Sequence, residues 1–136
     1  MDKKLKINPI PERTEEIAKA ILDSAFEIHT TLGPGLLESV YEACMVHELK
    51  MRGIKVISQF AFPVIYKGMK VDSGFRLDLL VEDCVIVEIK SADIISDVFK
   101  AQLLTYLRLA NIRLGLLINF NVFLLKNGIK PVINRF

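Results

Sequence analysis

Two charged side chains end an otherwise apolar segment, Cys84-Val-Ile-Val-Glu-Ile-Lys90. Glu88 and Lys90 are two residues apart, so in a β-strand they lie on one face of the sheet and the apolar residues fill the other. Asp78 interrupts the preceding apolar run, although aspartate is depleted in strands. These three residues are therefore the first candidates for chemistry.

The loop between the two segments decides whether the acids can meet. A two-residue loop at Glu82-Asp83 would set Asp78 opposite Val87, and Glu88 would then point the other way. A three-residue loop over 82–84, or one bulge, would set Asp78 opposite Glu88, with Cβ atoms about 5 Å apart. The sequence leaves both registers open.

Two carboxylates this close repel each other unless a cation lies between them. Mg²⁺ prefers carboxylate and carbonyl oxygens, so we predict Asp78, Glu88 and the backbone carbonyl of Ile89 as magnesium ligands. Lys90 would then hold or deprotonate an attacking water, or stabilise charge on a phosphoryl group. In the alternative interpretation Glu88 and Lys90 form an edge salt bridge and Asp78 is a strand-end residue.

A helical segment offers a third carboxylate. Glu38 and Tyr41 are three residues apart and share a helix face, and Gly35, one turn earlier, lets the backbone pack closely there. Glu38 is therefore predicted as a further acid of the metal site. The alternative is an acid that interacts favourably with the helix dipole near its N-terminus.

A later helical segment carries two polar candidates, Gln102 and Tyr106, four residues apart on one face. Gln102 could position a water or a phosphate, and Tyr106 could contact a backbone or a base. The alternative is the polar rim of a helix packed on the sheet.

The segments that must position these residues follow the order α-α-β-β-β-α-β-β. An antiparallel meander of three strands, followed by a helical crossover to another strand, predicts an α/β fold with a mixed sheet flanked by helices. Thr14 is expected to cap the first helix, and Gly74 to form a bulge. The predicted elements are a loose arm over 1–12, helices over 15–32, 36–51 and from Asp93 or Ser96 to 110, strands over 55–66, 71–81, 84–90, 113–120 and 122–126, and an edge strand or tail over 129–136.

Composition narrows the class of protein. The chain has 136 residues, half of them hydrophobic, and a net charge of +2, which predicts one domain with a full core. No apolar run is long enough to cross a membrane, no secretory signal is visible at the N-terminus, and two distant cysteines are expected as reduced thiols. A cytoplasmic location follows as the expectation.

The basic residues are unevenly placed. Residues 98–136 contain six basic residues and no acid, so the rest of the chain has a net charge of −4. This third could attract a phosphate backbone, or it could be a solvated positive face. The six are Lys100, Arg108, Arg113, Lys126, Lys130 and Arg135.

Taken together, the motifs resemble a known family. Gly35-Leu-Leu-Glu-Ser-Val-Tyr41 is similar to the pattern that names the GxxExxY proteins, and Asp78 with Glu88-Ile-Lys90 resembles the D…ExK core of the PD-(D/E)XK nuclease superfamily. Gln102-Leu-Leu-Thr-Tyr106 is similar to the QxxxY motif of its RecB-like exonuclease branch. The resemblance covers roughly residues 28–133.

The resemblance implies a restriction-endonuclease-like core, with Asp78, Glu88 and Lys90 as the catalytic set and Glu38 supporting the same metal site. We therefore predict these four residues as catalytic, and Tyr41, Gln102 and Tyr106 as substrate-binding residues. It also implies Mg²⁺ or Mn²⁺ as cofactor and DNA or RNA as substrate. Relatives often carry a histidine three residues before the glutamine, where this chain has Phe99.

Three hypotheses about function follow. The first is a metal-dependent nuclease that hydrolyses phosphodiester bonds. The second is a nucleic-acid-binding protein that keeps the fold without turnover, and the third is an assembly or toxin-like partner protein whose acidic cluster is structural. A homodimer is an option for the first, because one small chain could need a second copy to hold a duplex.

Overall fold

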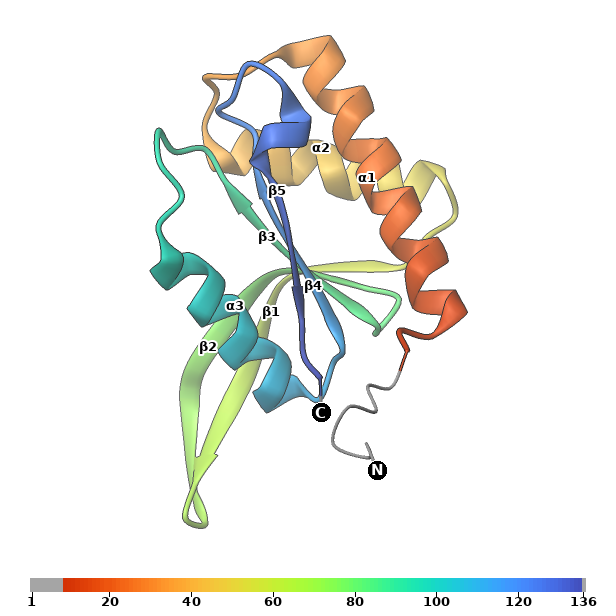
Figure 1. The fold of residues 1–136 in the computed structure, drawn as a ribbon. Coiled ribbons are helices and arrows are strands. Elements are labelled where there is room, and N and C mark those ends of the chain that lie inside the picture. Colours follow the sequence, from red (N-terminus) through yellow and green to blue (C-terminus); the bar gives the residue numbers. More distant parts are fainter. Residues whose placement is uncertain (1–8, 136) are drawn as a thin grey trace, which may run out of the picture.

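The structure, a computed structural model, describes residues 9–135. Its elements confirm the predicted order of two helices, three strands, a helix and two strands (Figure 1). They are α1 (Glu12–Leu32), α2 (Glu38–Met51), β1 (Val56–Tyr66), β2 (Met69–Val81), β3 (Val85–Lys90), α3 (Asp97–Ala110), β4 (Leu114–Asn119), the 3₁₀ helix η2 (Leu125–Gly128) and β5 (Ile129–Ile133).

The five strands form one mixed sheet in the order β1-β2-β3-β4-β5. All neighbouring pairs are antiparallel except β3 and β4, which are parallel and joined through α3. This is the predicted antiparallel meander followed by a helical crossover, so the α/β fold class is confirmed.

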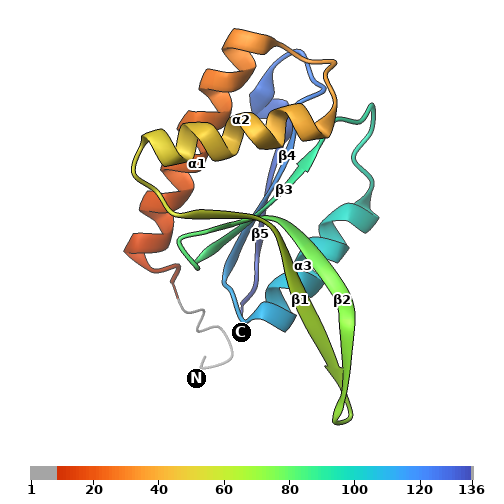
Figure 2. The ribbon, with the colours of Figure 1, turned by 180° about the vertical axis from the view of Figure 1, so that it is seen from behind.

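Helices cover both faces of the sheet (Figure 2). One core cluster joins α1 and α2 to the sheet and contains Ile21, Met45 and Val87, all without exposed surface. The second joins α3 to the opposite face through Leu103 and Leu107. Burial of these apolar side chains on both faces fixes the strands that carry the candidate acids.

The start of α1 differs from the prediction. The helix begins at Glu12, after Pro11, and the N–H of Glu15 donates to the Pro11 carbonyl at 3.1 Å. Proline suits this position because a helix start requires no N–H there. Thr14 therefore lies inside the helix, buried, and does not cap it. Most of the predicted N-terminal arm lies outside the described residues.

The strand predicted over 122–126 is wrong. The Val122 carbonyl instead accepts a hydrogen bond from His29 Nε2 of α1 at 2.8 Å, and Leu125 is buried in the core. This segment packs against α1 and forms η2, so its backbone does not join the sheet. The alternative of an edge strand in the last residues is confirmed by β5.

The predicted irregularity at Gly74 is present. The ladder between β1 and β2 pairs Phe62 with Phe75 but Val64 with Val71, so β2 has extra residues there. A Cβ at Gly74 would lie 2.6 Å from the backbone nitrogen of Val64. Only glycine allows so close an approach of the two strands.

Cys44 and Cys84 are both free thiols and half-buried. Within residues 9–135, none of the helices combines the length and the apolar character that crossing a bilayer requires.

Candidate active site

The strand register decides between the two alternatives for the acids. Leu79 pairs with Val87 and Val81 with Val85, so three residues, 82–84, form the loop between β2 and β3. Glu82 and Asp83 both adopt positive φ angles, 51° and 56°, in this turn. Continuing the register by one residue brings Asp78 next to Glu88.

The two carboxylates replace the backbone ladder at this point. Glu88 Oε2 accepts a hydrogen bond from the backbone N–H of Asp78 at 3.0 Å. In return, Asp78 Oδ2 accepts one from the backbone N–H of Ile89 at 2.8 Å. Each acid is thus anchored to the other strand, and the regular pairing of β2 with β3 ends at Leu79.

The environment of the pair disfavours two negative charges. Glu88 is only 6% exposed, and burial, followed by the charge of Asp78, raises its pKa to about 8. Burial also raises the pKa of Asp78, although its hydrogen bond from Ile89 and the charge of Lys90 oppose that shift. The arrangement is therefore most stable when a proton or a cation offsets part of the charge.

Lys90 lies at the end of β3, two residues beyond Glu88. Its Nζ is 4.4 Å from the ring centroid of Phe99, which belongs to the first turn of α3. None of the ion pairs found within residues 9–135 includes Lys90. The ammonium lies over an aromatic face, a favourable contact for a cation, and its charge opposes the rise in the pKa values of Asp78 and Glu88.

Glu38 lies at the rim of the site. Its Oε2 accepts a hydrogen bond from the backbone N–H of Ser91 at 3.3 Å, directly after β3. Its charge contributes to the raised pKa of Asp78. A pocket of about 530 Å³ opens beside it and is also lined by Ser39 and Asn121.

The donor atoms are suited to a divalent cation, but the acids are not all gathered. Two adjacent carboxylates with raised pKa values are the hard oxygen donors that Mg²⁺ and Mn²⁺ take. Within the described part of the chain, however, no group of three or more His, Cys, Asp or Glu side chains could hold a metal ion together. The structure brings Asp78 and Glu88 together and keeps Glu38 at Ser91.

Tyr41 does not lie where a substrate contact was predicted. Its ring has no exposed surface and stacks on Phe120 with centroids 4.4 Å apart. Its hydroxyl donates to the Gly33 carbonyl at 2.6 Å and accepts from the Leu36 N–H at 3.2 Å. Tyr41 therefore fixes the connection between α1 and α2, and its position is structural in place of the predicted substrate contact.

The two candidates on α3 differ from each other. Tyr106 is half-buried and stacks on Phe75 with centroids 4.4 Å apart. Burial raises its pKa, and the charges of Glu88 and Asp78 raise it further, so the field of the acid pair reaches this hydroxyl. Gln102, one turn earlier, is exposed.

Three residues near the acids were missed from the sequence. Glu42, one turn after Glu38, is half-buried and its pKa is raised by burial and by the charges of Asp78 and Glu38. Gln59 Nε2 donates to both Glu42 oxygens, at 2.9 and 3.1 Å. Helical spacing from Glu38 could have found Glu42.

The third missed residue is Asn119, at the end of β4 beside Lys90. Its buried amide donates to the Ala92 carbonyl at 2.9 Å and accepts from the Ala92 N–H at 3.0 Å. These bonds fix the chain just after Lys90. The sequence did contain a signal for this residue, since Asn119 ends an otherwise apolar strand. A buried amide needs hydrogen-bond partners, so an asparagine at such a position indicates a structural contact.

One of three comparisons with known proteins identifies a family. The family model described as the PD-(D/E)XK nuclease superfamily matches residues 15–132, a range that includes every candidate side chain above. Searches among curated proteins and among solved structures gave no significant match.

Proposed function

This chain belongs to the PD-(D/E)XK nuclease superfamily, and from that premise we propose that it is a metal-dependent nuclease, hydrolysing phosphodiester bonds of DNA or RNA. The observation that carries the proposal is the reciprocal anchoring of Asp78 and Glu88 across β2 and β3. Such an acid pair costs stability in an apolar sheet, so a function has to account for it.

In this proposal Mg²⁺ or Mn²⁺ is held by Asp78, Glu88 and the carbonyl of Ile89, and Glu38 supports it from the rim. The bound cation would polarise the scissile phosphate and lower the pKa of a bound water. Lys90 supplies a positive charge beside the pair, which stabilises negative charge that develops on the phosphoryl oxygens or holds the attacking water.

The remaining residues act on the substrate. Tyr106, whose hydroxyl is within the field of the acid pair, contacts the sugar-phosphate backbone or a base, and Gln102 positions a phosphate or a water. Within the superfamily, the motif of Gly35, Glu38 and Tyr41 supports an assignment to the GxxExxY proteins. The tyrosine of this motif stabilises the loop before α2 through its hydrogen bond to the Gly33 carbonyl.

The test is cleavage of single- and double-stranded DNA and RNA with Mg²⁺ or Mn²⁺. Wild-type protein should yield products that are absent with a chelator, and Glu88→Ala should lose cleavage. Glu27→Ala removes an exposed acid of α1 and should cleave like wild type. Equal cleavage by the Glu88→Ala variant would assign the activity to a contaminant or to another site.

A second function is favoured by one observation, the hydrogen bond that keeps Glu38 at Ser91. If Glu38 stays there, the site retains two acids, and the protein would bind nucleic acid or a partner without turnover. Titration of a labelled oligonucleotide at several salt concentrations separates the two functions. Affinity with a steep salt dependence and no product with any metal would favour binding alone.

A further inference from the structure

The β1–β2 hairpin projects from the body of the protein. β2 pairs with β3 only over Leu79–Val81, whereas its pairing with β1 continues to Tyr66 and Met69 at the turn. The tip of the hairpin lies far from the helices and the other strands in both views (Figures 1 and 2). Gln59 of β1 lies opposite Asp78, and β1 reaches the turn at Tyr66 seven residues later without the extra residues of β2. At about 3.3 Å per residue, the hairpin therefore extends about 23 Å from the acid pair to its tip.

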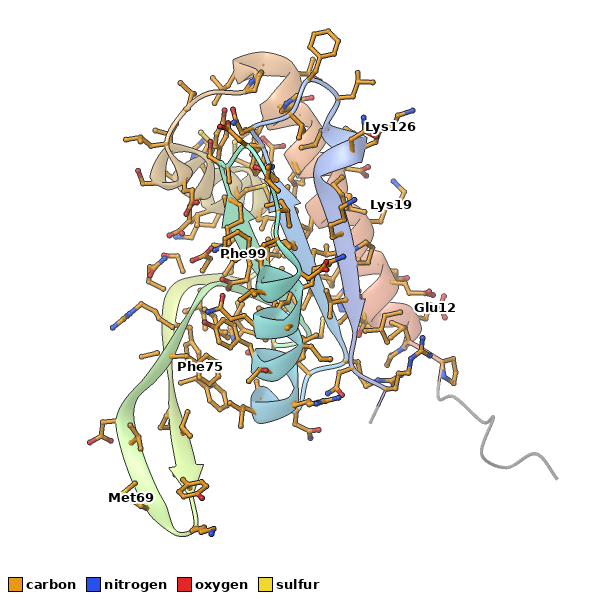
Figure 3. All side chains as sticks on the ribbon, turned by 60° about the vertical axis from the view of Figure 1, so that its left-hand side comes forward. Glu12, Lys19, Met69, Phe75, Phe99 and Lys126 are labelled. Carbon is orange, nitrogen blue, oxygen red and sulfur yellow. The ribbon has the colours of Figure 1, made fainter. Side chains whose placement is uncertain are left out.

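A row of aromatic rings leads from the acid pair along this hairpin. Phe75 lies three residues from Asp78 on β2 and stacks on Tyr106 of α3 with centroids 4.4 Å apart. Phe62 of β1 stacks on the Phe75 ring with centroids 5.3 Å apart. Phe60 meets the edge of Phe62 at 6.1 Å. Figure 3 shows Phe75 between the hairpin and α3, and Met69 near the tip.

The tip itself exposes apolar and aromatic surface. Ile65 and Tyr66 are each 60% exposed, and Met69 is 58% exposed. Three large exposed side chains on one projecting turn are a feature of interaction sites, because a monomer gains nothing from them.

The charge of the hairpin indicates the kind of partner. Residues 59–77 contain Lys67, Lys70 and Arg76 but a single acid, Asp72, which forms an ion pair with Lys70 at 3.6 Å. Lys67 Nζ lies 5.4 Å from the centroid of the Tyr66 ring. A cation next to an exposed aromatic face is suited to a phosphate next to a base.

We propose that this hairpin binds a single strand of nucleic acid that continues from the acid pair, with Tyr66 stacking on a base and Lys67 near a phosphate. The inference rests on the proposed function. A single strand fits better than a duplex because paired bases hide the faces on which Tyr66 would stack, whereas every unpaired base offers one. A strand with a rise of 3.4 Å per nucleotide covers this distance of about 23 Å in about seven nucleotides.

The experiment measures fluorescence anisotropy of labelled single strands of about 3 and about 20 nucleotides, with wild-type protein in a chelator so that nothing is cleaved. The long strand should bind much more tightly than the short one, which cannot reach from the acid pair to the tip. Tyr66→Ala should weaken binding of the long strand about tenfold, and Tyr66→Phe should retain it. Lys67→Ala should lower the salt slope by about 1.

Controls make the outcomes decisive. Met51→Ala removes an equally exposed apolar side chain at the far end of α2 (69%) and should bind like wild type. Unchanged affinity of Tyr66→Ala, with wild type still binding or cleaving nucleic acid, would overturn the binding role of the hairpin while leaving the proposed function intact.

Two other results would change the assignment of the tip. If Tyr66→Ala loses as much affinity for a blunt duplex as for a single strand, the single-strand preference is overturned. If wild type is a dimer that Tyr66→Ala converts to a monomer, the tip serves self-association. No binding or cleavage of any strand by wild type would reject the proposed function together with this inference.

Discussion

At the scale of single residues, Glu88 links the site to pH. Its pKa of about 8 in the folded chain lies above the ordinary value of 4.5, so between these pH values the folded chain holds a proton that the unfolded chain has lost. The free energy of unfolding should therefore fall as pH rises from about 5 to 8 without divalent cations, by up to about 1.4 kcal/mol per pH unit for this one group. Urea unfolding across this range measures the slope.

Glu88→Gln is the matched variant, since it keeps the shape of the side chain and has no charge to titrate. Its stability should be much flatter over the same range, with the remaining slope due to Asp78, whose pKa is also raised. If wild type and variant show the same slope, the raised pKa of Glu88 is contradicted.

Phe99 allows a prediction about Lys90. Phe99→Leu keeps an apolar side chain against α3 but removes the aromatic face 4.4 Å from the ammonium. The turnover number should fall roughly three- to thirtyfold, the range that corresponds to a cation–π contact, with KM little changed. Phe99→Tyr should retain activity. A Leu variant as active as wild type would show that the ring does not position Lys90.

Sequence patterns identified Asp78, Glu88 and Lys90 as neighbours but not their register. Period 2 places Glu88 and Lys90 on one face. The three-residue loop depends on positive φ angles at Glu82 and Asp83, which non-glycine residues adopt only rarely. The same limit applies to Gln59, whose φ of 54° turns the strand beside Asp78.

At the scale of elements, Tyr41 fixes the connection between the two first helices. Tyr41→Phe should keep the stack on Phe120 but remove the bonds to Gly33 and Leu36, at a cost of about 1–3 kcal/mol in the free energy of unfolding. Affinity for oligonucleotides should not change. A variant with wild-type stability and weakened binding would restore the predicted substrate contact.

The types of the helices and strands were predictable because the spacing of their apolar residues is clear. The start of α1 and the segment over 122–126 were not predictable in this way. The helical spacing of Ile17, Ile21 and Ile28 identifies α1. The segment before β5 reads as a strand from composition, but its partner is α1, through His29 and Val122. Such a contact, between residues 93 positions apart, leaves no trace in local sequence.

At the scale of the whole molecule, a divalent cation should stabilise the fold. Mg²⁺ or Mn²⁺ that binds only the folded chain should raise the melting temperature progressively. The free energy of unfolding should rise by about 1.4 kcal/mol for each tenfold increase in cation concentration above the dissociation constant. Asp78→Asn should lose this response, and matched ionic strength with NaCl should not reproduce it. An unresponsive wild type would favour a purely structural acid pair.

The basic residues that cluster in the last third of the sequence do not cluster on one element of the structure. The six basic residues of the last third are divided among α3, β5 and the segments around them (Figure 3 labels Lys126). A basic stretch in the sequence therefore does not define one basic surface. The whole-chain pattern predicted the mixed sheet correctly, because alternating and helical apolar periods follow the order of the elements.

We expect Asp78 and Glu88 to hold a divalent cation together. Anomalous diffraction from a crystal soaked in Mn²⁺ tests it most directly. We expect one strong peak at coordination distance, about 2 Å, from an oxygen of each carboxylate. A peak that contacts only one of the two carboxylates, or no peak at either acid when manganese binds elsewhere, would show that the two acids do not form a shared cation site.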